Sequence, residues 1–195
     1  MNAPPLIATA VVPLRTRIVG QEDPGVMSLP IRPVVRPMAA TDFEQVRRIY
    51  ALGIATRNAT FETEVPEADA LDTKWIRGQR WVVTLDGAVA GWAAMTAVST
   101  RECYRGVAET SIYIDTAVSG RGLGRQLLAH QIEAALAGGF WTLQTAIFPE
   151  NQASLALHHR AGFRDVGRRE RIAQLDGVWR DTILLELRAG GTMPS

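Results

Sequence analysis

The sequence predicts one α/β (α+β) domain with a mixed sheet at its centre, and three observations support this class. Segments with strand and helix patterns follow one another in the order β-α-α-β-β-β-α-β-α-β-β, which is typical of a sheet with helices packed on it. The 195 residues fit a single domain of ordinary size, and 47% of them are hydrophobic, enough for a substantial core. We therefore expect about seven strands and about four helices between residues 31 and 190.

Composition narrows the classes of function. The net charge of +1 gives no reason to expect a nucleic-acid partner or a membrane surface. No apolar run approaches the roughly 20 residues of a membrane-spanning helix. Cys103 is the only cysteine, so we expect no internal disulfide and a reducing, cytoplasmic location. The histidines show no ligand spacing with acidic residues, so we expect no metal site; they are His130, His158 and His159.

The two ends of the chain differ from its middle. Residues 1–30 show no sustained period and predict a flexible extension, with prolines at Pro4, Pro5, Pro13, Pro24 and Pro30. Residues 191–195 form a short tail. The domain begins near Ile31 with "RPVVRPM", a short strand whose prolines favour a sheet edge.

Two helices are expected before the first long strands. Thr41 is a good N-cap, and Glu44 three residues later completes a capping box. The helix that follows runs to about Ala55, with apolar residues recurring on one side. After the loop "NATFETEVP", a second helix is expected from about Pro66 to Arg77.

The remaining elements follow from turn signals and periodicity. Two strands in "RWVVTLDGAVAGWAAMTAV" meet at Asp86-Gly87, a strong hairpin signal, and another strand runs from about Gly106 to Ile114. A glycine-rich loop then leads into a helix that stops at Gly138-Gly139. The strand "WTLQTAIF" and the short helix "NQASLALHHRAGF" come next. A closing hairpin has Asp176-Gly177 near its turn.

The loop in "DTAVSGRGLGRQLL" is a candidate phosphate site. Gly120, Gly122 and Gly124 alternate with arginines, and an apolar helix pattern follows directly. The string matches neither the Walker loop nor the dinucleotide fingerprint. A glycine turn at a helix N-terminus presents backbone N–H groups to an anion, and Arg121 and Arg125 add positive charge, which suits a pyrophosphate. A tight turn that only leads into a helix explains the same letters equally well.

Motifs elsewhere in the chain favour the phosphate site over the plain turn. "SGRGLG" resembles the pyrophosphate motif of the GNAT superfamily of acetyl-CoA-dependent N-acetyltransferases, although Ser119 stands where Gln or Arg is usual. "AETSIYI", "NQASLALHHRAGF", "DGVWRD" and "NATFETE" resemble the branch of phosphinothricin and methionine sulfoximine/sulfone acetyltransferases. The resemblance covers about residues 31–188. It implies the GNAT fold, with a V-shaped splay between the fourth and fifth strands, acetyl-CoA as co-substrate, and a homodimer.

Two residues are candidates for acid–base catalysis. Acetyl transfer needs a neutral amine, a polarised thioester carbonyl and a proton for the leaving thiolate. Glu109 is a lone carboxylate in a strand that is otherwise apolar or hydroxyl-bearing, where apolar surroundings favour a general base. The resemblance assigns it that role, whereas the pattern alone also fits an outward-facing glutamate. His158 stands where many GNAT enzymes carry a tyrosine that protonates the thiolate; a structural histidine fits the letters too.

The resemblance also assigns the coenzyme contacts. The backbone of the strand would bind pantetheine as an added strand does, the loop amides would bind the pyrophosphate, and one face of the short helix would contact the coenzyme. Asn151 is equally a good N-cap. The residues concerned are Ile112, Tyr113, Ile114, Gly120, Arg121, Gly122, Leu123, Gly124, Arg125, Asn151 and Ser154.

The resemblance implies that the acceptor contacts map onto two short pieces of the chain, and that the loop "NATFETE" lines the wall of the pocket. Arg101 is suited to pairing with an amino-acid carboxylate, as is Arg105. Trp179 is a candidate to close the pocket, although core packing is the commoner role of an aromatic residue. The expected acceptor residues are Phe61 and Thr63, then Ser99, Thr100 and Arg101, and then Glu109, Thr110 and Ser111.

The favoured function is transfer of acetyl from acetyl-CoA to the α-amine of a small amino-acid-like acceptor. We expect direct attack in a ternary complex, because Cys103 has no matching base motif. Acetylation of a protein N-terminus or of a polyamine is an alternative, and a non-catalytic acetyl-CoA sensor is another. Arginines in the mapped loops favour an acid-bearing acceptor, and Glu109 favours an enzyme over a sensor.

Overall fold

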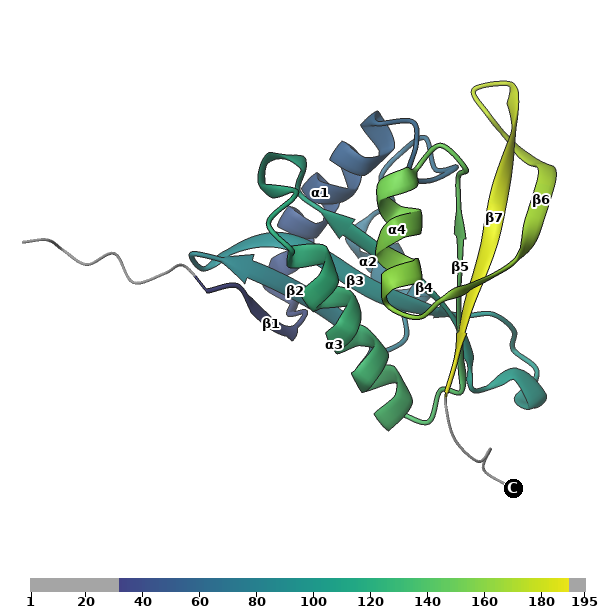
Figure 1. Cartoon of the computed structure of the whole chain (residues 1–195). Coiled ribbons are helices and arrows are strands. Elements are labelled where there is room, and N and C mark those ends of the chain that lie inside the picture. Colours follow the sequence, from purple (N-terminus) through teal and green to yellow (C-terminus); the bar gives the residue numbers. More distant parts are fainter. Residues whose placement is uncertain (1–31, 190–195) are drawn as a thin grey trace, which may run out of the picture. The chain divides into compact units, whose positions relative to one another are not determined.

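The computed structural model describes residues 32–189, so the predicted extension and tail lie outside the described residues. A mixed seven-stranded sheet in the order β1-β2-β3-β4-β5-β7-β6 is flanked by four α-helices (Figure 1). The strands are β1 (Val34–Pro37), β2 (Arg80–Leu85), β3 (Ala88–Ala97), β4 (Val107–Ile114), β5 (Thr142–Ile147), β6 (Arg164–Leu175) and β7 (Val178–Arg188). The helices are α1 (Phe43–Ala55), α2 (Ala68–Lys74), α3 (Leu123–Ala137) and α4 (Gln152–Arg160). The predicted fold class is confirmed.

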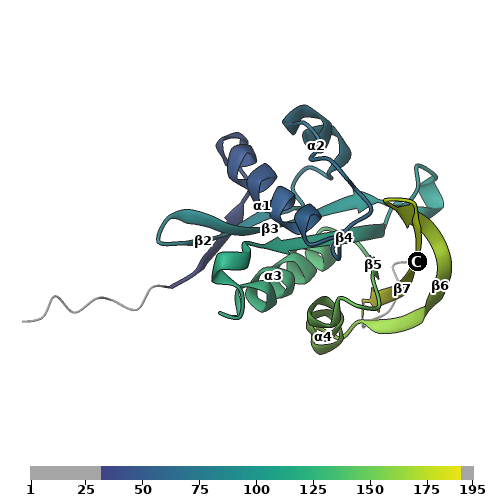
Figure 2. The same ribbon diagram turned by 90° about the horizontal axis from the view of Figure 1, so that it is seen from above.

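The helices divide between the two faces of the sheet. Figure 2 shows α1 and α2 on one face and α3 and α4 on the other. Each face has its own buried cluster: Ile49, Trp75 and Trp92 pack under α1 and α2, whereas Leu128 and Leu143 pack under α3. Neighbouring side chains of a strand point to opposite faces. The residues of β4 therefore contribute alternately to the two sides.

The pairing of β4 with β5 is the only parallel pairing among the described strands, and it is short. It joins Val107 to Thr142, Ala108 to Leu143, and Glu109 to Gln144. Beyond Glu109, β4 pairs only with β3, through to Ile114 opposite Gly91. The two strands therefore diverge after Glu109, as the V-shaped splay requires, and residues 110–114 keep one backbone edge free of β5.

The first helix begins differently from the prediction. Thr41 lies within a short 3₁₀ helix, Ala40–Asp42, and α1 starts at Phe43 without a side-chain cap. The carboxylate of Asp42 accepts a hydrogen bond from the Ala39 N–H at 2.8 Å and pairs with Arg36 at 2.6 Å. The hydrogen bond from Arg36 also holds the pKa of Asp42 below its usual range. The Thr41–Glu44 capping box is therefore wrong, because Thr41 lies inside the 3₁₀ helix and α1 begins only after Asp42.

The second helix is shorter than expected at both ends. It ends at Lys74 because Trp75 takes an extended conformation, with φ −88° and ψ 139°. The N–H of Ile76 then donates to the carbonyl of Met95 in β3, at 2.8 Å. This bond to the sheet replaces the last helical turn that the sequence predicted.

Both predicted hairpin turns are confirmed. Asp86 and Gly87 have φ values of 52° and 79°, and Asp176 and Gly177 have 51° and 78°, as two-residue hairpins of right-handed twist require. Leu185 of the closing hairpin is fully buried in the core. No helix within residues 32–189 is long and apolar enough to cross a bilayer. In the same range no group of three or more His, Cys, Asp or Glu residues is placed to hold a metal ion.

Candidate active site

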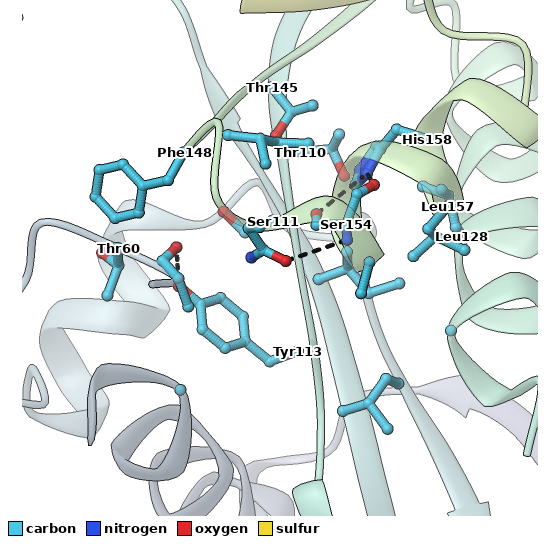
Figure 3. A pocket seen from close by; sticks show the side chains of 18 of the residues that line it. Thr60, Thr110, Ser111, Tyr113, Leu128, Thr145, Phe148, Ser154, Leu157 and His158 are labelled. Carbon is cyan, nitrogen blue, oxygen red and sulfur yellow. Dashed lines mark hydrogen bonds between the residues drawn. The ribbon is translucent and has the colours of Figure 1, made fainter. Parts of the chain in front are cut away.

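A large cleft in the described part of the chain lies where β4 and β5 diverge. It is a cleft of about 1400 Å³ bounded by β4, the glycine loop, β5, α4 and the loop after α1. Figure 3 shows side chains from four elements around it: Tyr113 of β4, Leu128 of α3, Thr145 of β5 and Ser154 of α4. The cleft therefore joins the predicted phosphate loop to the predicted base.

The glycine loop forms one end of the cleft. Gly120 and Gly122 have φ values of 79° and 78°, a conformation that favours glycine, and Gly122 is the N-cap of α3. The first turn of a helix leaves its N–H groups without intrahelical partners, and they point toward this end. Gly120, Gly122, Leu123, Gly124 and Arg125 all line the cleft. Arg121 is exposed and is absent from the described lining residues.

The free edge of β4 forms one long wall. Ile112, Tyr113 and Ile114 line the cleft, at the edge that β5 leaves unpaired. The ring of Tyr113 stacks on Trp92 with centroids 4.6 Å apart, and burial raises the pKa of its hydroxyl. This side chain thus belongs to the core, so a contact of Tyr113 with a ligand would have to come from its backbone groups.

Glu109 stands at the point where the two strands part. It is the last residue of β4 aligned with β5, opposite Gln144, and it lines the cleft. It also lines a second pocket of about 270 Å³ on the α1 and α2 side of the sheet. Glu109 is exposed, and the apolar residues Leu71, Trp75 and Trp92 line the smaller pocket with it, so the apolar surroundings expected for it are present on one side only.

The neighbours of Glu109 on β4 have separate roles. Thr110 points to the opposite face, is 2% exposed, and donates its hydroxyl hydrogen to the side-chain oxygen of Gln131 on α3. Ser111 lies on the same face as Glu109, is half-buried, and lines both pockets. Ser111 is therefore better placed than Thr110 to contact an acceptor through its hydroxyl.

The N-terminal end of α4 is fastened by Asn151. Its side-chain oxygen accepts from the Ser154 N–H at 3.1 Å, which confirms the N-cap. Its Nδ2 donates to the Asn58 carbonyl at 2.9 Å, which ties the loop after α1 to α4. Asn151 and Ser154 both line the cleft.

His158 is buried behind the same face of α4. It is 1% exposed, its Nδ1 donates to the Ser154 carbonyl at 2.9 Å, and burial lowers its pKa. Among the described residues, its Nε2 has no hydrogen-bond partner. The neutral ring in this arrangement leaves Nε2 as an acceptor, so donation of a proton to a thiolate requires the imidazolium.

The predicted acceptor residues are only partly brought together. Phe61 lines the cleft and packs edge-on against Phe148, with centroids 4.8 Å apart, whereas Thr63 is exposed and outside the described lining. The three residues 99–101 are also outside the described lining of both pockets. Arg101 stacks over Tyr104 instead, at 5.6 Å.

Two more predicted contacts lie elsewhere. Arg105 stacks over Trp141 at 5.4 Å and lies 3.4 Å from Glu102. Trp179 is 52% exposed and belongs to neither described pocket lining. Sequence reasoning missed several lining residues, which come from four elements and from the loop after β5: Tyr50, Lys74, Thr145, Arg169 and Phe148.

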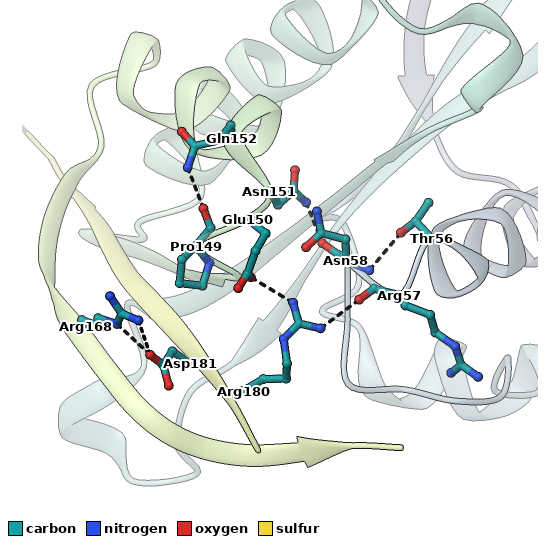
Figure 4. A network of polar contacts seen from close by, with 10 residues as sticks. All are labelled: Thr56, Arg57, Asn58, Pro149, Glu150, Asn151, Gln152, Arg168, Arg180 and Asp181. Atoms are coloured by element: carbon teal, nitrogen blue, oxygen red, sulfur yellow. Dashed lines mark hydrogen bonds and ion pairs between the residues drawn. The ribbon is translucent and has the colours of Figure 1, made fainter. Parts of the chain in front are cut away.

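Polar contacts fasten the loop after α1 across the opening of the cleft. Arg180 of β7 donates to the Arg57 carbonyl at 3.1 Å and pairs with Glu150 at 2.9 Å (Figure 4). Its guanidinium also lies 4.2 Å from the centre of the Phe148 ring. We call Arg180, Glu150 and the Arg57 carbonyl the Arg180 clasp. With the Asn151 bond, it holds the loop that carries Phe61.

Comparison with known proteins places this site in a family. A family model described as "Acetyltransferase (GNAT) family" matches residues 47–163. The chain is 32% identical over 164 residues to the L-methionine sulfoximine/L-methionine sulfone acetyltransferase of Pseudomonas aeruginosa, covering 81% of this chain and 95% of the relative. It is 33% identical over 167 residues to the phosphinothricin N-acetyltransferase of Alcaligenes faecalis, covering 81% and 84%.

A solved structure of the same family also matches this chain. The GNAT superfamily phosphinothricin acetyltransferase from Sinorhizobium meliloti, in complex with AcCoA, matches with a TM-score of 0.74 at 29% identity. The match covers 81% of this chain and 89% of that one. The fold and the site thus define an acetyltransferase. This chain belongs to the GNAT family, and its relatives include phosphinothricin and methionine sulfoximine/sulfone acetyltransferases.

Proposed function

We propose that this chain transfers the acetyl group of acetyl-CoA to the α-amine of a small amino-acid-like acceptor. The proposed acceptors are compounds of the phosphinothricin, methionine sulfoximine and methionine sulfone type. The observation that carries the proposal is the position of Glu109, at the apex of the splay and in the same cleft as the glycine loop. The substrates in the printed names of the relatives support the acceptor class.

The proposed reaction is direct attack in a ternary complex. Glu109 takes a proton from the acceptor ammonium, directly or through water, and the neutral amine attacks the thioester carbonyl. A backbone N–H of residues 112–114 polarises that carbonyl, and the amides from Gly120 to Arg125 hold the pyrophosphate. The tetrahedral intermediate then collapses, the carbon–sulfur bond breaks, and the thiolate gains a proton.

His158 is proposed as the source of that last proton. It lies on the face of α4 whose residues line the cleft, which supports the role. Its lowered pKa sets a condition, because only the imidazolium has a proton to give at Nε2. Protonation of the thiolate by water is the competing route when His158 is neutral.

The proposal includes a setting for the enzyme. We propose a cytoplasmic homodimer that needs no metal and has neither a nucleic-acid nor a membrane partner. The net charge of +1 and the single cysteine support this setting.

The test follows coenzyme A release from acetyl-CoA with a thiol reagent. Phosphinothricin, methionine sulfoximine, methionine sulfone and a polyamine are supplied separately to the wild type, to Glu109→Gln and to Glu133→Gln. Glu133 is a matched control, since it is exposed on α3 and outside the described lining of both pockets. The proposal is supported if the wild type and Glu133→Gln acetylate the amino-acid analogues and Glu109→Gln acetylates them slowly. Binding of acetyl-CoA without turnover of any acceptor contradicts the substrate class.

A further inference from the structure

An amino-acid acceptor carries a carboxylate beside its amine, and a cationic side chain in the site is a strong partner for it. Arg101 and Arg105 were expected to supply one. They stack instead on Tyr104 and Trp141, and both are outside the described lining of the two pockets. The carboxylate partner must therefore come from another part of the site.

The smaller pocket contains a suitable pair of charges. It has a volume of about 270 Å³ and lies between α1, α2, β3 and β4. Among its described lining residues, Lys74 is the only cation and Glu109 the only anion. Both residues also line the large cleft. A small pocket with one group of each sign complements a zwitterion, which carries an ammonium and a carboxylate on one carbon atom.

The backbone of Lys74 is held firmly in place. Leu71 is 1% exposed and Trp75 is 5% exposed, so buried side chains anchor α2 on either side of Lys74. The Ile76 N–H then donates to the Met95 carbonyl at 2.8 Å, which fixes the chain to the sheet. The ammonium therefore moves on a flexible stem from a fixed point beside the pocket.

The present partner of Lys74 is easily exchanged. Its Nζ lies 3.6 Å from Oε1 of Glu62, and the two side chains are 50% and 45% exposed. Such exposed pairs contribute little, about 0–1 kcal/mol. A ligand carboxylate can thus replace Glu62 at small cost.

We propose that Lys74 binds the α-carboxylate of the acceptor and determines the preference for amino acids. This inference rests on the proposed function. Lys74 holds the carboxylate while Glu109 receives the ammonium, so the two residues together orient the amine toward the thioester. Lys74 is a specificity-determining residue in this role. It is also the only lysine in the sequence, so isotope-labelled lysine reports on this side chain alone.

Arg169 is the competing cation. It lies on β6, lines the large cleft, and its Nε donates to the Thr182 hydroxyl at 3.4 Å. It is not among the described residues that line the smaller pocket with Glu109. The structure therefore favours Lys74, and the test includes both residues.

The experiment compares methionine sulfone with its carboxamide, which keeps the amine and loses the negative charge. Lys74→Met should lower kcat/KM for the acid by about 10- to 100-fold, mainly through KM, and leave the value for the amide nearly unchanged. Lys74→Arg should recover part of the loss. Arg77→Gln, at an exposed arginine close to Lys74 but outside the described lining of both pockets, is the control and should keep the wild-type ratio of acid to amide. Acetyl-CoA affinity should be the same in all variants.

A second readout uses the single lysine. In protein labelled with ¹³C-lysine, methionine sulfone should shift the NMR signal of the Lys74 ε-methylene group, and the carboxamide should not. The assignment is overturned if Lys74→Met lowers kcat/KM for acid and amide equally, or if Arg169→Gln abolishes the preference and Lys74→Met does not. A wild type that acetylates neither compound contradicts the proposed function itself, and the assignment of Lys74 then falls with it.

Discussion

Nη2 of Arg180 lies 2.9 Å from Oε2 of Glu150, so an ion pair joins β7 to the turn that precedes α4. The same guanidinium donates to the Arg57 carbonyl and covers the ring of Phe148. The hydrogen bond from Arg180 also lowers the pKa of Glu150. The Arg180 clasp thus connects three segments that are far apart in the sequence and adjacent at the opening of the cleft.

Arg180→Gln should loosen the loop that carries Phe61. We expect KM for the acceptor to rise several-fold while the affinity for acetyl-CoA stays the same, because the clasp touches the acceptor wall and not the glycine loop. The free energy of unfolding should fall by only about 1 kcal/mol, since the pair is partly exposed. Steady-state kinetics and urea unfolding measure both effects.

Arg168→Gln is the control for this variant. Arg168 also pairs with a carboxylate on the β6–β7 hairpin, Asp181, but its side chain is 58% exposed and outside the described cleft lining. Its kinetics should match the wild type. Equal changes in KM for the two variants would assign the effect to the hairpin as a whole.

Glu109→Gln should lose most of its activity near neutral pH and regain part of it as the pH rises. A glutamine cannot take a proton from the acceptor ammonium, and general-base catalysis contributes about 10²- to 10⁴-fold. At higher pH more of the amine is already neutral, so the need for a base declines. A pH–rate profile of kcat/KM for both proteins tests this. A constant ratio across the pH range would mean that Glu109 does not act as the base.

Gly122→Ala should weaken acetyl-CoA binding. Gly122 has a φ of 78° and nothing lies within 4 Å of the added Cβ, so backbone strain is the main effect on folding, about 1 kcal/mol. Relief of that strain would rotate the loop amides away from the pyrophosphate. Calorimetric titration with acetyl-CoA measures the loss.

Gly78→Ala is a closely matched control. Gly78 also has a φ of 78° with nothing within 4 Å, but it lies before β2 and outside the described lining of the cleft. Both variants should lose similar stability. If they also lost similar affinity for acetyl-CoA, the glycine loop would have no special role in binding.

His158 should make stability depend on pH. Burial lowers its pKa in the folded protein, so the unfolded chain takes up a proton first as the pH falls. The stabilising contribution of the neutral ring is therefore present above about pH 6.5, the usual histidine value, and declines as the pH falls toward the lowered value. Urea unfolding at several pH values should show a steeper loss for the wild type than for His158→Asn. Parallel curves would contradict this account.

The sequence predicted elements whose causes are local. Asp86-Gly87 specifies a hairpin through its own backbone preference, and Asn151 caps α4 through a contact three residues away. The capping box at Thr41 failed because Thr41 lies inside a 3₁₀ helix, where Asp42 accepts from the Ala39 N–H and pairs with Arg36. The preferences of single residues do not show that a 3₁₀ turn will precede the helix.

The parts of the site that belong to sequence motifs could be predicted. Glu109 and the glycine loop have recognisable letters, and both line the cleft. The charge of Arg101 made it a candidate for binding a carboxylate, but charge does not determine whether a loop residue faces the cleft. Lys74 and Phe148 reach the pockets from α2 and from the end of β5, and no spacing in the sequence links them to Glu109.

Because β4 pairs with β5 only as far as Glu109, the rest of β4 has a free edge of fixed length. The free edge of β4 covers residues 110–114, a length of about 17 Å at about 3.3 Å per residue. One end of that length is the glycine loop and the other is Glu109. If the loop holds the phosphate of an acyl carrier, as we propose, that carrier presents its thioester to Glu109 only when its arm spans this distance. The proposed site would then select its donor by length, separately from any group that recognises the acceptor.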